Sequence, residues 1–386
     1  MTLYIVKCEL KKIASLPMLW IFLSLCLILN AGIIEGYRYS NVDESFFSYV
    51  KETAAITGTE LGGEFSERLA GLKDSEEKRR LYEETYGVKN IYEDLKVVDL
   101  GQAYISVYAL PDRWAALMRN KYQCLQPMVD ELARSNAGFS LYAAGETKNL
   151  HDLLFSILFR TITGEACVLA ALCMIFLYGY EYQNKTEAII YTSYTGRNIQ
   201  HGKLAAGLLM GCFSYSLIAG ITLLIYLGVF DYSWIWSSNV SGIFNYVEEI
   251  IGIKPFLTWI PFTLWEYLLV MLGLGLMLTL IFGLIGAVIG RLCKNSYIGA
   301  ISFLLLALAM MTAPYFLAEK DLWGGYFVSQ FLPVCLWLNS SVWLTDMGII
   351  SLIPFHETIG LFGNVIIWGI LTAVSSWHFS GKDVLL

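Results

Sequence analysis

Long apolar runs alternate with polar stretches of very different length along this chain. A helix needs about 20 apolar residues to cross a bilayer, and six runs are near or above that length. They occupy residues 16–34, 152–179, 204–230, 257–290, 297–317 and 361–379. This pattern predicts an all-α polytopic membrane protein with six transmembrane helices. The fourth run exceeds one crossing, so we expect its aromatic start in the headgroup zone on the outer side.

Residues 1–15 predict a different element ahead of the first run. Apolar residues recur there at helical spacing and lysines occupy the other side, as in a helix that lies in the membrane interface. We therefore treat 1–34 as an amphipathic helix followed by the first span. A secretory signal peptide is the competing interpretation, disfavoured because Asn30-Ala31-Gly32 is a poor cleavage site.

The segment 35–150 is long, charged and without a spanning run. Helical spacing and helix stop signals predict three helices in it. These cover 61–72, 75–86 and 112–134, with Pro127 interrupting the third. Residues 103–110 fit either a helix or a strand. The segment has the size of a domain, so we expect it to fold as one helix-rich extracellular unit.

The segment 319–357 leaves an alternative open. Residues 326–344 within it are apolar enough to span a membrane, but they include Gln330, Pro333 and Asn339. Polar groups and a helix breaker favour a re-entrant pair of short helices that is buried among other helices. Residues 151–386 then contain spans two to six, and a seventh span over 326–344 is the alternative.

Lysine and arginine residues orient the predicted spans. With six crossings and the N-terminus inside, the inner segments hold nine of them against two in the two shorter outer loops, as the positive-inside rule requires. The nine are Lys7, Lys11, Lys12, Lys185, Arg197, Lys203, Arg291, Lys294 and Lys382, and the two are Lys254 and Lys320. Both termini are therefore expected in the cytoplasm.

Composition narrows the function classes. Of the 386 residues, 56% are apolar and 15% are charged, the mean hydropathy is +0.56, and the formal net charge is −7. The acidic balance argues against a nucleic-acid partner. The cysteines and histidines show no spacing typical of a metal site or a disulfide framework. We therefore expect no metal site and no cofactor bound by this chain.

Two ionisable residues fall inside the second run. Arg160 and Glu165 lie five positions apart, and a charge within a membrane marks a candidate functional residue because its burial in lipid is costly. They predict a polar element along a substrate route between protomers. The alternative is that the apolar span begins near Ile162, which leaves Arg160 at the headgroups.

Small residues in the third and fourth runs predict close helix packing. Gly207 and Gly211 form a GxxxG pair, and Gly283, Gly286 and Gly290 share one face of a helix. We expect these faces, together with the amphipathic start and the second span, to be the packing surfaces toward a second subunit.

The polar stretch 178–203 between the second and third runs predicts a short docking helix. Asn184 and Glu187 have the spacing of a capping box at its start, and Gly196 supplies a stop. A helix of about ten residues is marginal by itself in water. The apolar residues of this helix have nothing local to bury against, so we expect them to bind another protein; they include Ile189, Ile190 and Tyr194.

This arrangement resembles a bacterial ABC-2 type transporter permease over the whole chain. The residues Glu181-x(3)-Lys185-Thr-Glu187, then Gly196-Arg197, then Lys203, are similar to the family pattern E-x(3)-K-T-E…G-R…K between its second and third spans. The resemblance implies that 181–203 is a coupling segment whose helix inserts into a separate ATPase subunit. Its charged residues would pair at the rim of the ATPase cleft, and its apolar residues would fill the cleft.

The resemblance also implies the partners. These are an ABC ATPase subunit in two copies, which binds ATP and Mg, and a second permease subunit, identical or paralogous, in the lipid of the plasma membrane. The chain is then not catalytic by itself. Residues 196–204 are the part of the sequence most similar to a nucleotide-binding loop, but they have Leu204 at the position where a Ser or Thr must bind Mg. The expected function is export of a peptide, antibiotic, lipid or ion by alternating access. A membrane-anchored sensor or immunity protein, whose extracellular domain binds an antimicrobial peptide, is the alternative.

Overall fold

The computed structural model describes residues 2–141, 146–186, 189–190, 199–231, 233–242, 245–293 and 295–381. Within them, six helices are long and apolar enough to cross a membrane, which confirms the predicted helical membrane-protein class and number of spans. They are α2 (Pro17–Asn41), α10 (Phe159–Gln183), α12 (Ile199–Val229), α13 (Leu264–Cys293), α14 (Ser296–Glu319) and α17 (His356–Gly381). Helix α10 continues α9 (Thr147–His151) and a π-helical turn, η3 (Asp152–Leu158).

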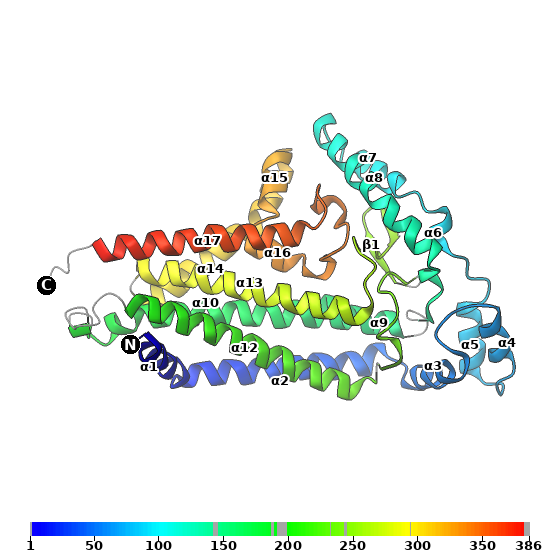
Figure 1. The fold of residues 1–386 in the computed structure, drawn as a ribbon, viewed down its shortest axis with the longest axis horizontal. Helices are drawn as coiled ribbons and strands as arrows, with labels where there is room; N and C mark the ends of the chain where they lie inside the picture. Colours follow the sequence, from blue (N-terminus) through cyan, green and yellow to red (C-terminus); the bar gives the residue numbers. More distant parts are fainter. Residues whose placement is uncertain are drawn as a thin grey trace.

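The long helices form one elongated bundle with two different ends (Figure 1). Helix α1 (Thr2–Ala14), the last turn of α10, the first turn of α12 and the last turn of α17 share one end, here called the terminal end. The segment 35–150 lies at the opposite, distal end. Helix α2 continues past residue 34 to Asn41, because a helix can extend beyond the apolar run that crosses the bilayer.

Helix α10 is the centre of the bundle. Its most apolar window is 72% buried, against 61% or less in the other five spans. Glycines let the neighbouring helices approach it closely. A Cβ added at Gly207 or Gly286 would collide with Met174 or with the Ala171 carbonyl oxygen of α10.

The other glycines of the two predicted faces also lie close to neighbouring helices. An added Cβ would lie 3.3 Å from the Ala170 Cβ at Gly211 and 2.9 Å from the Tyr178 Cβ at Gly290, whereas Gly283 faces α12 at Leu208, 3.2 Å away. These glycine faces are thus occupied within the chain. Gly283 is covered by α12 and the other four glycines by α10, so these faces serve packing within the chain, and the second subunit stays a prediction.

The segment 35–150 has two cores instead of one. Helices α3 (Glu44–Thr57), α4 (Gly63–Ala70) and α5 (Glu76–Thr85) pack around one cluster of buried residues. Helices α6 (Ile91–Asp94), α7 (Val97–Val107) and α8 (Asp112–Arg134) pack around another. The second core also contains Leu257, Phe327 and Leu352 from the rest of the chain. The α6–α8 part therefore completes its core with distant segments, and the extracellular unit stays a prediction.

Helix α8 does not break at Pro127, contrary to the prediction. It runs from Asp112 to Arg134, with Leu125, Val129 and Leu132 completely buried. Proline inside a helix costs about 3 kcal/mol, and burial of apolar side chains on both sides of it offsets that cost. The ambiguous residues 103–110 are helical as far as Val107, the last residue of α7.

The segment 319–357 forms short helices and no spanning helix. They are α15 (Trp323–Ser329), α16 (Pro333–Leu338) and the 3-10 turns η6 (Ser340–Val342) and η7 (Gly348–Ile350). Pro333 begins α16, where its missing N–H costs nothing. The Asn339 side chain donates a hydrogen bond to Gln330 at 3.1 Å. The alternative of a seventh span is therefore wrong.

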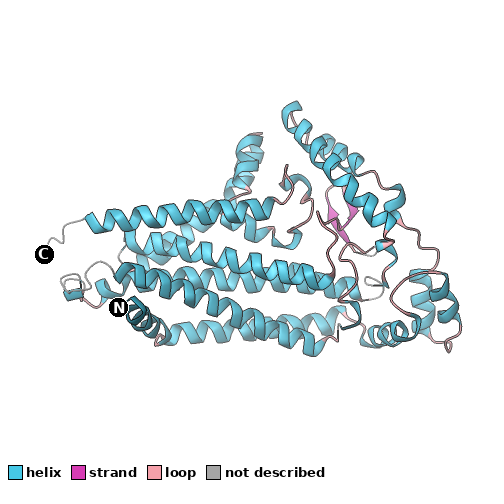
Figure 2. Cartoon of the chain, in the orientation of Figure 1, coloured by secondary structure: helices cyan, strands magenta, loops and turns pink. Residues whose placement is uncertain are grey.

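One small sheet interrupts the helical fold, and the sequence patterns did not predict it (Figure 2). Strands β1 (Tyr246–Glu249) and β2 (Gly252–Pro255) pair antiparallel, with Tyr246 opposite Pro255 and Glu249 opposite Gly252. Gly252 adopts a φ of +115°, which disfavours a side chain. The turn was missed because it has no Asn-Gly or Asp-Gly pair.

The contact of Gly286 with α10 yields a stability prediction. Gly286→Ala is expected to destabilise the bundle by about 1–3 kcal/mol, because the new methyl group meets backbone that cannot move independently. Gly273→Ala on the same helix is the matched control; its Cβ would meet nothing within 4 Å, so it should be neutral or stabilising by up to ~1 kcal/mol. Thermal unfolding in detergent micelles measures both, and equal melting temperatures would contradict the packing assignment.

Candidate functional site

A cluster of buried charges joins three helices at the terminal end. Glu181, at the end of α10, accepts hydrogen bonds from Lys12 of α1 at 2.9 Å and from Lys203 of α12. Lys12 also binds Glu9 at 2.5 Å, and Lys203 donates to the Leu177 carbonyl at 2.5 Å. Glu9, Glu181 and Lys203 are each at most 1% exposed. We call these four charged residues the terminal cluster.

An arginine ties two more helices to the same region. Arg291, near the end of α13, donates to the Thr372 carbonyl and the Ser375 hydroxyl of α17 at 2.7 and 2.8 Å, and to the Tyr178 hydroxyl of α10 at 2.7 Å. Tyr178 in turn donates to the Gln200 carbonyl of α12 at 3.1 Å. The terminal ends of α10, α12, α13 and α17 are thereby connected by hydrogen bonds.

The predicted coupling segment begins in this cluster, at Glu181, and continues past the end of α10. Asn184 ends α10, and its side chain donates to the Tyr180 carbonyl at 2.8 Å. Its predicted role as the start of the next helix is therefore wrong: the same side chain can cap a preceding carbonyl as well as a following N–H. Lys185 follows with a φ of +55°, which turns the chain away from α10.

The described residues include only part of the predicted docking helix. Ile189 is 72% exposed, and the Ile190 N–H donates to the Thr186 carbonyl at 3.1 Å. The predicted docking residues Glu187, Tyr194, Gly196 and Arg197 lie outside the described residues. Of the predicted motif, the structure thus brings Glu181 and Lys203 together.

Arg160 and Glu165 lie on α10 but bind different partners. The Arg160 guanidinium donates to the Ser341 hydroxyl at 2.9 Å, and Glu165 accepts from the Asn30 amide at 2.9 Å. The ring of Trp337 packs against Gly164, where an added Cβ would lie 2.7 Å from it. The Trp337 indole also donates to the Arg160 carbonyl at 2.8 Å. Arg160 and Glu165 are therefore held as separate polar groups on one helix.

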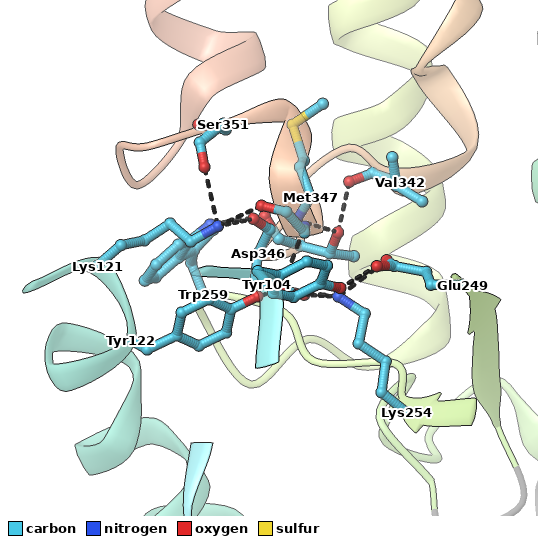
Figure 3. Close-up of polar contacts among 12 residues, drawn as sticks. Tyr104, Lys121, Tyr122, Glu249, Lys254, Trp259, Val342, Asp346, Met347 and Ser351 are labelled. Carbon is cyan, nitrogen blue, oxygen red and sulfur yellow. Dashed lines mark hydrogen bonds and ion pairs between the residues drawn. The ribbon is translucent and has the colours of Figure 1, made fainter. Parts of the chain in front are cut away.

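A second cluster of buried charges lies at the distal end (Figure 3). Lys121 of α8 donates to the carbonyls of Asp346, Gly348 and Ser351 at 2.9, 2.6 and 2.9 Å. Asp346 accepts from Lys254 of β2 at 2.7 and 2.8 Å and from the Tyr122 hydroxyl at 2.6 Å. We call this the distal cluster, and it joins the α7–α8 part to the loop before α17.

Glu249 of β1 completes the distal cluster. It forms an ion pair with Lys254 at 3.0 Å and accepts a hydrogen bond from the Tyr104 hydroxyl of α7. Figure 3 shows Lys121 and Lys254 reaching the loop around Asp346 from two sides. Helices α7 and α8, the β1–β2 hairpin and this loop are thus held by one network.

In the distal cluster, burial and nearby opposite charges shift the pKa values of Lys121 and Asp346 in opposite directions. Burial lowers the pKa of Lys121 to about 7, Asp346 opposes the change, and Lys254 adds to it. Three carbonyl acceptors match the three N–H groups of an ammonium. Burial alone would raise the pKa of Asp346, but Lys254 and Lys121 outweigh burial and hold that pKa below its ordinary value of 3.8. The charged form of Lys121 is therefore stabilised by Asp346, and the charged form of Asp346 by Lys121 and Lys254.

The sequence patterns missed several residues of both clusters. Glu9 lies among the lysines of the amphipathic start, Lys121 lies in a polar segment where a charge is ordinary, and Asp346 lies in the loop segment 319–357 outside the predicted spans. No local spacing distinguishes them from solvated residues.

Family models, curated proteins and solved structures were each compared with the chain, and none matches.

Removal of one charge from the terminal cluster is predicted to be costly. Lys203→Met should destabilise the protein by about 3–5 kcal/mol, because Glu181 then loses one of its two cationic partners in a buried site. Lys11→Met is the control; Lys11 is exposed on α1, so its change should stay within about 0.5 kcal/mol. Equilibrium unfolding in mixed micelles compares the two, and similar values would show that the cluster contributes little.

The distal cluster predicts a loss of stability in acid. Because the pKa of Asp346 is lowered in the folded protein, its stabilisation is complete above 3.8 and is lost as the pH falls below that value. Hydrogen exchange of α7 and α8 should therefore accelerate as the pH is lowered through this range, after correction for the intrinsic pH dependence of exchange. Asp346→Asn should exchange faster at neutral pH and show less additional acid dependence. An unchanged acid response in this variant would assign the effect to other carboxylates.

Proposed function

We propose that this chain is the membrane-spanning permease subunit of an ATP-driven exporter of the ABC-2 type. The observation that carries the proposal is the terminal cluster. It connects α1, α10 and α12 at the two ends of the polar segment 181–203, which are Glu181 and Lys203. A partner that moves this segment would act directly on α10. Since α10 is the most buried span, its displacement would reach the rest of the bundle.

The proposed orientation places the terminal end in the cytoplasm of a cell with the chain in its plasma membrane. The lysines and arginines of the predicted inner segments support it. Both termini are then cytoplasmic, and 35–150 is extracellular. The short helices α15 and α16 then form a re-entrant outer segment before α17, which fits their length and their internally bonded polar side chains.

The exporter needs partners that supply energy and complete the route. We propose two ATPase subunits, which bind ATP and Mg, and a second permease subunit, identical or paralogous. ATP binding would close the ATPase pair and push on 181–203, and the ion pairs of Glu181 would transmit the push to α10, α12 and α1. The spans would then open outward and release the substrate. Arg160 and Glu165 are the candidate residues along its route.

Two apolar residues of the coupling segment provide the test: Ile189, which is exposed, and Ile190, which is half-buried. Ile189→Asp combined with Ile190→Asp is expected to abolish co-purification of an ATPase subunit and transport-coupled hydrolysis, because a carboxylate cannot be buried in an apolar cleft without a partner. Ile250→Asp is the matched control; Ile250 is 78% exposed and lies in the turn between β1 and β2. It should leave both readouts unchanged. Unaltered co-purification in the double variant would contradict docking at these residues. Absence of an ATPase partner from the unaltered chain would favour the sensor or immunity alternative.

A further inference from the structure

A groove of about 430 Å³ lies along α10, bordered by α2, α13, α14 and α16. This volume is typical of sites for small molecules. Its walls are mainly apolar, and two ionisable side chains line it as well. The residues used below are Phe22, Phe303, Leu304, Trp337, Arg160 and Glu165.

Each ionisable side chain of the groove has one buried atom without a hydrogen bond among the described residues. For Arg160 this atom is Nε, and for Glu165 it is Oε1. Arg160 uses another nitrogen to bind Ser341, and Glu165 uses its other oxygen to bind Asn30. An unsatisfied buried polar atom is costly, and more so when its group is charged. The two atoms therefore mark places where a ligand would supply the missing partners.

The charges of the groove define the head group of that ligand. The Arg160 guanidinium presents N–H donors suited to a phosphate or carboxylate. The unpartnered oxygen of Glu165 accepts an N–H donor, and a primary ammonium adds charge complementarity. Five residues of helix separate the two by about 7.5 Å along the axis. The Trp337 ring packs against Gly164, which lies between the two along α10.

The surroundings define the rest of the ligand. Helices α2 and α14 are buried over only 28% and 17% of their apolar windows, so both expose long apolar surfaces to the bilayer. An acyl chain entering between them would lie against Phe22, Phe303 and Leu304. A lipid can enter from this side, whereas a soluble zwitterion would first have to cross apolar surface.

We propose that the groove binds a phospholipid with a primary ammonium head group, of the phosphatidylethanolamine class. Its phosphate lies at Arg160, its ammonium lies at Glu165, and an acyl chain follows the apolar walls. The role of this lipid as exported substrate rests on the proposed exporter function, but its binding does not.

Binding is measured on the purified full chain in nonionic detergent. The probe is phosphatidylethanolamine with brominated acyl chains, which quenches nearby tryptophan, and Trp337→Phe identifies the signal from the groove. We expect saturable quenching by this lipid. Phosphatidylcholine has no N–H donor and phosphatidic acid has no ammonium, so each should bind about tenfold more weakly.

Variants assign the two ends of the head group. Arg160→Gln should weaken phosphatidylethanolamine binding about tenfold, and Arg160→Lys should restore part of it. Glu165→Gln should remove most of the preference over phosphatidylcholine while the phosphate contact remains. Lys320→Gln, an exposed residue outside the groove, should bind as the unaltered chain does. Gel filtration and the melting temperature establish that each variant is folded.

The outcomes separate this inference from the proposed function. Absence of saturable quenching, or equal affinities for the three lipids in the folded unaltered chain, overturns the inference even if an ATPase subunit co-purifies. Selective binding that depends on Arg160 and Glu165, together with no ATPase partner, supports the lipid site and overturns the exporter. Selective binding together with lipid-stimulated ATP hydrolysis in the reconstituted complex supports both.

Discussion

The close approach of α12 and α13 to α10 is the contact on which the other features depend. Glycines on α12 and α13 let these helices approach the α10 backbone and side chains more closely than a methyl group would permit. In a membrane, association of helices relies on such packing more than on removal of apolar surface from water. This contact brings the last turn of α10 beside α12, where Glu181 and Lys203 can pair. Without it, Glu181 and Lys203 would not meet, and Lys203 would lose its carboxylate partner.

Buried charges then join the two ends of the bundle to the segments outside it. At the terminal end, one carboxylate of α10 holds lysines from α1 and α12. At the distal end, Asp346 and the carbonyls around it hold lysines from α8 and β2. A buried ion pair needs complete hydrogen bonding to offset the loss of hydration, so each network favours one arrangement of its elements. Both ends are therefore suited to transmit motion as connected units.

Sequence patterns predicted the parts of the fold whose cause is local. The six spans follow from the length of their apolar runs, and the helix predicted over 75–86 is α5, which begins at Glu76. The errors arose where one local pattern permits two structures. Asn184 can cap the helix before it or the helix after it, and Pro127 can end a helix or bend within it. In the candidate site, Glu181 and Lys203 belonged to the quoted motif, but their pairing and the role of Glu9 could not be inferred from spacing.

The sequence by itself determined the number and order of the spans, the polar segment between the second and third spans, and the small residues that permit close packing. Each depends on residues within about one helix length of each other. Only the tertiary structure decided which charges are buried together. Lys12 meets Glu181 across 169 residues, and Lys121 meets the Asp346 carbonyl across 225. A lysine has the same local pattern whether solvent or a distant carboxylate surrounds it, because its partner is selected by the packing of helices and not by its neighbours in the chain.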